Sequence, residues 1–240
     1  MSKKKKKQDT EENYINHELM GTFKELPSLI AKNDNQKKLI RSIDNNMITI
    51  GYGPSGCGKT FVSLLKAFYI LRTSDIYKKI ILIKSVTVSN GEDIGFIPGT
   101  VDDKMTPYMM SYACNIDKIF DKKDKIKDLQ SKGLLEVQPL SYIRGMNLDN
   151  AIVIIDETQN IQTEMFKTII TRIGENTKYI ILGDPEQNDR LYKESSCMSK
   201  IIEAFREHSD IINIVEFDDN DCVRNPIIPK ILQVLRDNNL

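Results

Sequence analysis

A glycine-rich segment between an apolar run and an amphipathic run most constrains how this chain can fold. Residues 53–60 read Gly-Pro-Ser-Gly-Cys-Gly-Lys-Thr and fit the Walker A pattern G-x-x-x-x-G-K-[ST]. The apolar and β-branched residues 47–50 before it predict a buried strand. Apolar residues recur at helical spacing after it, at Phe61, Leu64, Leu65, Phe68 and Leu71. A glycine-rich loop between a strand and a helix is the context that a phosphate-binding P-loop requires.

The chemistry of such a loop comes mainly from its backbone. Its glycines let successive N–H groups curl around phosphate oxygens, and the helix N-terminus adds the positive end of its dipole. We expect Lys59 to reach the β- and γ-phosphates and Thr60 to hold Mg²⁺. A functionless glycine-rich turn is the alternative, and the flanking strand and helix argue against it. The expected nucleotide-binding residues are Gly53, Pro54, Ser55, Gly56, Cys57, Gly58, Lys59 and Thr60.

Strands and helices are predicted to alternate along the chain. The expected strands are residues 47–50, 80–83, 135–137, 151–155, 179–182 and 211–215, and the expected helices are residues 33–45, 61–71, 116–129, 165–173, 196–208 and 226–236. Glycine and proline punctuate residues 88–107, which predicts a long surface loop. Because the strands are apolar throughout, the pattern indicates an α/β fold with a parallel sheet covered by helices on both faces.

The length and the charge of the chain limit its domain organisation and its binding partners. The 240 residues suit one domain at 14–240, preceded by a polar, disordered tail at 1–13 in which residues 3–7 are all lysine. A nucleic-acid-binding arm is the alternative reading of that tail. The formal net charge is zero, so any nucleic-acid contact must come from a local patch. No apolar run is long enough to span a membrane, and the scattered cysteines favour a reducing cytoplasm over a zinc site.

Acidic and amide side chains follow two of the predicted strands. Asp156 comes directly after four apolar residues, and we expect it to contact Mg²⁺ alongside Thr60. Glu157, next to it, is placed to orient and deprotonate a water that attacks the γ-phosphate. The alternative is a strand-end acid that caps the following turn. Gln187 follows the next strand and, with Gln159, could sense the γ-phosphate, although a surface glutamine is the commoner fate.

Five segments together resemble the PhoH family of P-loop ATPases, whose core is similar to superfamily 1 helicases. They read GPSGCGKT (53–60), GEDIGFIPGTVDDKMTPY (91–108), IRGMNLDNAIVIIDETQN (143–160), TRIGENTKYIILGDPEQND (171–189) and DCVRNP (221–226). The resemblance implies ATP binding and hydrolysis, a RecA-like fold and a role on RNA or DNA. It also implies that Gln36, upstream of the P-loop, reads the edge of adenine. Thr158 departs from the family pattern, which often has alanine there.

Two arginines are candidates for the cation that stabilises charge on the γ-phosphate. Arg224 lies within a family motif, and Arg144 precedes the strand that ends at Asp156. A surface ion pair is the alternative for each, and we favour Arg224. Helicases of the similar superfamily close ATP between two core domains, whereas this chain has room for one. We therefore expect a homo-oligomer, such as a hexameric ring, in which Arg224 reaches the neighbouring site.

The sequence as a whole predicts a Mg-dependent ATPase whose catalytic residues are Lys59, Glu157, Gln187 and Arg224. Its partners are expected to be ATP and either RNA or single-stranded DNA, without a membrane. An ATP-dependent regulatory switch and a small-molecule kinase are the alternatives, and Glu157 argues against the kinase. The expected compartment is the cytoplasm. Chains rich in Lys, Asn and Ile are similar to those carried by bacteriophages, in which case it is the host cytoplasm.

Overall fold

Strands and helices alternate along the part of the chain that the computed structural model describes, residues 21–84, 101–187, 197–225 and 227–238, with the backbone alone at 101–108 and 141. The helices are α2 (Asp34–Asn45), α3 (Lys59–Thr73), α4 (Val101–Phe120), α5 (Lys125–Ser131), α6 (Thr163–Ile170), α7 (Cys197–Phe205) and α8 (Ile227–Asp237). The strands are β1 (Ile48–Tyr52), β2 (Lys79–Lys84), β3 (Leu135–Pro139), β4 (Ala151–Asp156), β5 (Lys178–Gly183) and β6 (Asn213–Glu216). The predicted tail lies outside these residues.

The six strands form one sheet in the order β3-β2-β4-β5-β1-β6, and every pairing is parallel. Strand β5 therefore lies between β1, which leads into the P-loop, and β4, which ends at Asp156. Strands β4 and β5 are buried almost throughout, as expected for a parallel sheet covered on both faces. The predicted α/β architecture, a parallel sheet flanked by helices, is confirmed.

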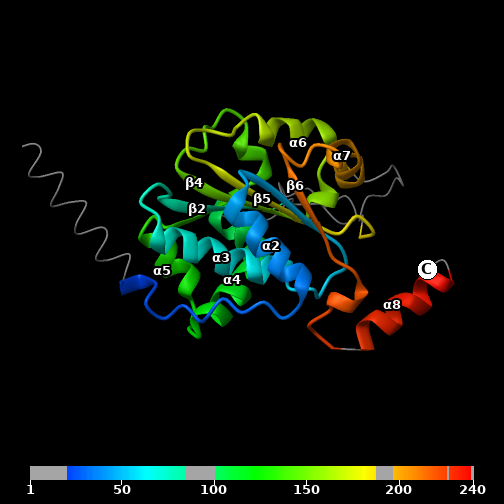
Figure 1. Ribbon diagram of the computed structural model, residues 1–240. Helices are drawn as coiled ribbons and strands as arrows, with labels where there is room; N and C mark the ends of the chain where they lie inside the picture. The colour runs from blue at the N-terminus through cyan, green and yellow to red at the C-terminus, as the bar shows by residue number, and fades with distance from the viewer. Residues whose placement is uncertain (1–20, 85–100, 188–196, 226, 239–240) are drawn as a thin grey trace, which may run out of the picture.

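Helices cover both faces of the sheet, with α2 to α5 on one side and α6 and α7 on the other (Figure 1). The first layer packs around three phenylalanine rings, and the Phe68 ring lies 5.1 Å from that of Phe120 and 5.8 Å from that of Phe23. The second layer buries Ile169, Met198 and other apolar side chains against the opposite face. Helix α8 stands apart from both layers (Figure 1). The two apolar cores hold the strand ends in fixed positions.

Two predicted element boundaries in the middle of the chain were wrong. Helix α4 begins at Val101, so the last part of the predicted loop is helical, including Pro107. The rest of that loop, residues 88–100, lies outside the described part of the chain. The predicted helix 116–129 is two helices, because α4 ends at Phe120 and left-handed residues follow at Asp121 and Asp124, with φ of 48° and 56°. Aspartate tolerates this conformation better than most residues.

The loops that leave the strands bring the predicted site residues to one edge of the sheet. Gly53, the first residue after β1, has a φ of 133°, and a Cβ built there would lie 2.1 Å from the Phe217 carbonyl oxygen. Only glycine fits this position, because the end of β6 runs directly beside the loop. The P-loop is therefore anchored to its neighbouring strand before it turns into α3.

Candidate functional site

A cavity of about 300 Å³ opens at the carboxyl ends of β1, β4 and β5. Nine of the residues predicted from the sequence line it: Ser55, Gly56, Gly58, Lys59, Thr60, Asp156, Glu157, Gln187 and Arg224. The other lining residues are Phe61, Asn115, Lys118, Gly183, Asp184 and Val223. Most of the predicted phosphate, metal and acid residues therefore share one cavity.

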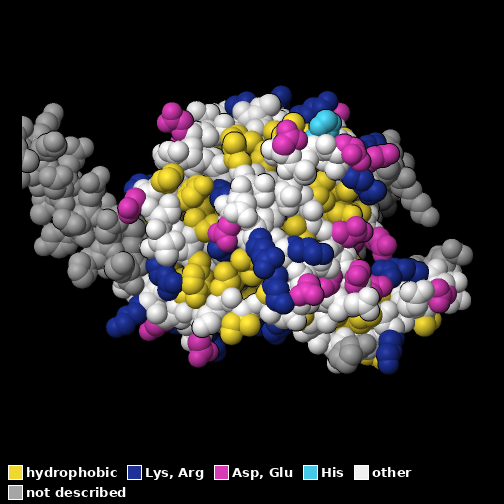
Figure 2. Space-filling model, viewed as in Figure 1, with side chains coloured by type: hydrophobic (Ala, Val, Ile, Leu, Met, Phe, Trp, Pro, Cys, Tyr) yellow, Lys and Arg dark blue, Asp and Glu magenta, His cyan; other side chains and the backbone are white. Residues whose placement is uncertain are grey.

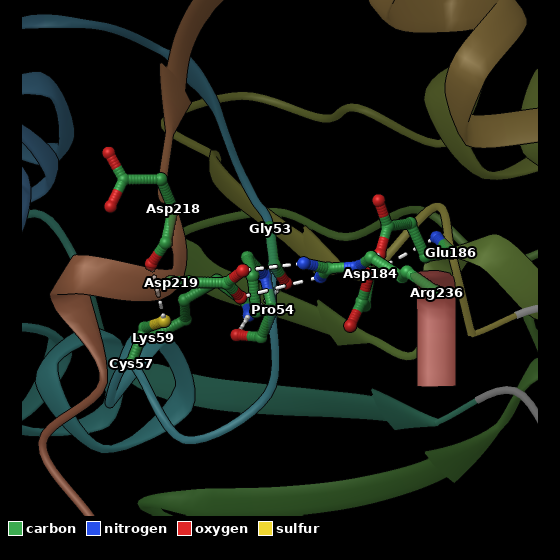
Figure 3. Close-up of polar contacts among 9 residues, drawn as sticks. All are labelled: Gly53, Pro54, Cys57, Lys59, Asp184, Glu186, Asp218, Asp219 and Arg236. Atoms are coloured by element: carbon green, nitrogen blue, oxygen red, sulfur yellow. Dashed lines mark hydrogen bonds and ion pairs between the residues drawn. The ribbon is translucent and has the colours of Figure 1, made fainter. Parts of the chain in front are cut away.

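The P-loop wraps around the ammonium group of Lys59. The loop turns at Gly56 and Gly58, whose φ values of 88° and 78° favour glycine, and Gly58 caps the N-terminus of α3. Lys59 Nζ donates to the carbonyl oxygens of Gly53 at 2.6 Å and Pro54 at 2.8 Å (Figure 3). Desolvation lowers the pKa of Lys59 from its ordinary value. A buried ammonium beside converging backbone N–H groups favours an anionic ligand.

Thr60 and Asp156 meet at the position predicted for a metal. The Thr60 hydroxyl donates to Asp156 Oδ2 at 3.0 Å. Desolvation, followed by the neighbouring charge of Glu157, raises the pKa of Asp156, and the hydrogen bond from Thr60 opposes this shift. A hydroxyl and a carboxylate oxygen fit Mg²⁺, which takes few protein ligands and completes its shell with water and substrate phosphates.

Glu157 occupies a strained position at the end of β4. Its φ of 57° is left-handed, which is uncommon for a residue other than glycine and is concentrated at functional sites. Its carboxylate accepts from Gln159 Nε2 at 2.8 Å, and Gln159 Oε1 accepts from the backbone N–H of Asp184 at 3.0 Å. The side chain of Gln159 therefore connects the acid at the end of β4 to the end of β5.

The end of β5 contributes a buried acid and an exposed amide. Asp184 is only 7% exposed, and desolvation raises the pKa of its carboxyl group. Its carbonyl oxygen accepts from the backbone N–H of Gln187 at 3.0 Å, which holds the turn that brings Gln187 to the cavity. Gln187 is exposed, so its amide is accessible from solvent.

Val223 and Arg224 form the wall beside the P-loop. The backbone N–H of Val223 donates to the Gly56 carbonyl oxygen at 3.0 Å, and a Cβ built at Gly56 would lie 3.3 Å from Arg224 Cδ. The side chain of Arg224 thus lies over the P-loop of its own chain, which argues against our expectation that it serves a neighbouring subunit. Arg144 is exposed and does not line the cavity.

Two residues predicted to bind the nucleotide lie behind the P-loop. Gln36 is buried and donates from Nε2 to the Cys57 carbonyl oxygen at 2.9 Å, while its Oε1 accepts from the backbone N–H of Lys32 at 2.8 Å. Its contact with adenine stays a prediction. Cys57 is fully buried, and desolvation raises the pKa of its thiol to about 11. Burial therefore disfavours the thiolate form of Cys57.

Sequence reasoning missed the wall that α4 contributes. Asn115 and Lys118 line the cavity, but the predicted helix began at residue 116, so their common face was not recognised. Polar residues at positions 111, 115 and 118 share one helical face, which is the signal that could have found them. Val223 was missed because a lone valine in a turn carries no signal of its own.

Known proteins are similar to the part of the chain that holds the cavity residues. The sequence model of the family described as PhoH-like protein matches residues 28–236. A PhoH-like protein of Bacillus subtilis is 34% identical over 206 residues, which cover 86% of this chain and 63% of that protein. Protein PhoH of Escherichia coli is 31% identical over 205 residues, which cover 85% of this chain and 57% of that protein. The chain therefore spans less than two thirds of the length of these curated relatives.

Solved structures that resemble this chain include two helicases. The Hef helicase domain of Pyrococcus furiosus is similar with a TM-score of 0.45 and 11% identity, over 77% of this chain and 37% of that one. The Pif1 helicase of Candida albicans is similar with a TM-score of 0.44 and 14% identity, over 86% of this chain and 44% of that one. No helix in the described ranges is both long and apolar enough to cross a membrane.

Proposed function

This chain belongs to the PhoH-like protein family, and from that premise we propose that it binds Mg·ATP and hydrolyses it, in a cycle coupled to RNA or single-stranded DNA. The observation that carries the proposal is the contact between Thr60 and Asp156, with Glu157 next to it in the same cavity as the P-loop. Two metal-binding side chains, a general-base carboxylate and a phosphate-binding loop are the parts that ATP hydrolysis requires.

Each part has a separate task in the proposed reaction. The P-loop N–H groups and Lys59 bind the phosphates, while Thr60 and Asp156 hold Mg²⁺, which neutralises phosphate charge when bound. Glu157 accepts a proton from the attacking water, and Gln159 orients the Glu157 carboxylate through the 2.8 Å hydrogen bond. Gln187 and Arg224 reach the γ-phosphate from the other walls of the cavity.

Two substitutions test the hydrolytic proposal. Lys59→Ala is expected to abolish ATP binding, because it removes the charge that faces the phosphates. Glu157→Gln is expected to retain ATP binding and to lower turnover by about two to four orders of magnitude, the usual effect of general-base catalysis.

ATP binding is measured by calorimetry and turnover by phosphate release. Glu164→Gln, which alters an exposed acid on α6, is the matched control. Equal loss of ATP binding in Lys59→Ala and Glu157→Gln would contradict the role of Glu157.

The coupling to nucleic acid needs a separate measurement. ATPase turnover is compared with and without RNA, single-stranded DNA and duplex DNA, and stimulation by one of these polymers is expected. Turnover unaffected by all three would instead favour a switch that binds ATP to change partners. Transfer of the γ-phosphate to a small molecule, seen by chromatography of the products, would favour a kinase.

A further inference from the structure

Helix α4 presents a continuous polar face that leads into the cavity. The Ser111 hydroxyl accepts from Lys84 Nζ at 2.9 Å, and Asn115 Nδ2 donates to the Ser111 carbonyl oxygen at 2.9 Å. Lys118 follows Asn115 by three residues on the same face, and both line the cavity. Asn115 is half-buried and Lys118 is exposed, so the lysine is free to move toward a ligand.

This face belongs to a helix that packs beside the strand ends that carry Asp156 and Glu157. The Tyr112 hydroxyl donates to the Ile83 carbonyl oxygen at 3.3 Å, which fixes α4 beside the end of β2. The next residue of β2, Lys84, is in register with Asp156 at the end of β4. Burial raises the pKa of Tyr112, and the nearby charges of Asp156 and Glu157 raise it further. The helix that carries Lys118 is therefore fixed beside the end of β4, and Lys118 lines the same cavity as Asp156 and Glu157.

The ammonium group of Lys118 has no competing partner in the part of the chain that the structure describes. Among the described residues, its Nζ makes no hydrogen bond and no ion pair. The same holds for the guanidinium of Arg224, which lines the cavity near Gly56. Two unpaired cations on separate walls, with Lys59 between them, attract a ligand that carries several negative charges. Lysine, a compact charge on a flexible stem, suits a terminal phosphate.

We propose that Lys118 is a further phosphate-binding residue, which contacts the γ-phosphate and makes the cavity favour nucleoside triphosphates over diphosphates. The inference rests on the proposed ATPase function, because it assumes that the ligand is a nucleotide. Its chemical basis is that a charge-assisted hydrogen bond to the γ-phosphate exists only while that phosphate is present.

The test compares two ligands on three variants. Calorimetry measures the affinity of a non-hydrolysable ATP analogue and of ADP, both with Mg²⁺, for the full chain. Lys118→Met is expected to weaken the ATP analogue about tenfold, while ADP stays within about twofold of wild type. Lys118→Arg, which keeps the charge, is expected to restore most of the loss. Lys122→Met, which removes an exposed charge just after α4 and outside the cavity lining, is expected to change neither affinity.

The outcomes separate this inference from the proposed function. Wild type that binds neither ligand overturns both. Wild type that binds both, with Lys118→Met unchanged for both, overturns the role of Lys118 alone. An equal loss for ATP analogue and ADP overturns the assignment to the γ-phosphate, because the lysine then acts on phosphates that the two ligands share.

Discussion

At the scale of single residues, Asp156 is expected to stabilise the bound metal at the expense of the fold. Its carboxyl pKa is raised above the ordinary 3.8, mainly by desolvation. An acid with a raised pKa in the folded state contributes stability below its unfolded pKa and loses that contribution as pH rises through the folded value. At neutral pH the burial of the Asp156 carboxyl group therefore costs stability unless a cation offsets its charge.

Asp156→Asn is predicted to raise the melting temperature at neutral pH while it abolishes Mg-dependent hydrolysis. The amide oxygen can accept from the Glu157 backbone N–H as Oδ1 does, and the amide nitrogen can donate to the Thr60 hydroxyl, so both contacts survive while the buried charge is removed. We expect a gain of roughly 0.5–2 kcal/mol, typical of substitutions that relieve a functional site. Circular dichroism melts from pH 8 downward should show the gain shrink as pH falls and vanish well below 3.8, where Asp156 is protonated in both states.

The matched control is Asp75→Asn, because Asp75 is exposed and lies outside the cavity lining. It should leave both the melting temperature and its pH dependence close to those of wild type. A melting temperature of Asp156→Asn below that of wild type at neutral pH would count against a destabilising charge at this position.

The residue positions differ in how far the sequence could predict them. Lys59, Thr60 and Asp156 were predictable, because a loop or an acid directly after a buried strand must lie at the carboxyl edge of the sheet. The burial of Cys57 was not predictable, because it depends on packing against residues that are remote in the chain. Its Sγ approaches the Asp218 carbonyl oxygen at 3.6 Å. Local spacing carries no information about such contacts.

At the scale of elements, every ion pair that joins α8 to the body among the described residues comes from Arg236. None of its residues is buried, and Ile231 and Val234 are 51% and 60% exposed. Arg236 near its end donates to Asp219 and to Glu186, which lies between Asp184 and Gln187 in the turn after β5 (Figure 3). Figure 2 shows acidic and basic side chains close together where α8 meets the body. The ion pairs of Arg236, together with the partial burial of Ile228, Pro229 and Leu232, therefore place this helix.

Arg236→Gln is predicted to loosen α8 without unfolding the domain. Ion pairs at such partly exposed sites are worth up to about 1 kcal/mol each, so amide protection in α8 should fall about fivefold. The global melting temperature should change by less than about 2 °C, because α8 buries no residue. Hydrogen exchange measured on peptides from residues 227–237 reports the first quantity.

Lys230→Gln is the comparison for this prediction, since Lys230 is exposed on the same helix. It should leave the amide protection of α8 unchanged. If Arg236→Gln also leaves it unchanged, the two ion pairs do not hold the helix.

The boundaries of elements were harder to predict than their order. The alternation of apolar strands with amphipathic helices was enough for the parallel sheet, because few folds cover such strands on both faces. The end of α6 was not predictable from helical spacing. Apolar residues continue that spacing to Ile173, but the helix stops at Ile170 and Ile173 instead pairs with Leu148 as an isolated bridge. A pairing partner 25 residues away decides this boundary.

At the scale of the whole molecule, the described residues that line the cavity all belong to one parallel-sheet core and the segment that follows β6. The segment after β6 returns to the P-loop, where the backbone N–H of Val223 donates to the Gly56 carbonyl oxygen at 3.0 Å. This return was not predictable, because it depends on β6 lying beside β1 in the sheet. It places the side chain of Arg224 beside the P-loop of its own chain. Oligomerisation stays a prediction independent of this geometry.

The placement of Arg224 predicts that it acts within its own chain. Arg224→Ala should bind ATP normally and hydrolyse it about three to five orders of magnitude more slowly, the usual worth of an arginine that stabilises γ-phosphate charge. Mixing Arg224→Ala with Glu157→Gln should restore no turnover, because every active site then lacks one of its two residues.

Phosphate release is measured over a series of mixing ratios of the two variants, with subunit exchange verified by labelled chains. Recovery that peaks at an intermediate ratio would show that Arg224 serves a neighbour, since only shared interfaces can combine an intact Glu157 with an intact Arg224. A wild type that is monomeric and fully active would support the same-chain assignment without any mixing.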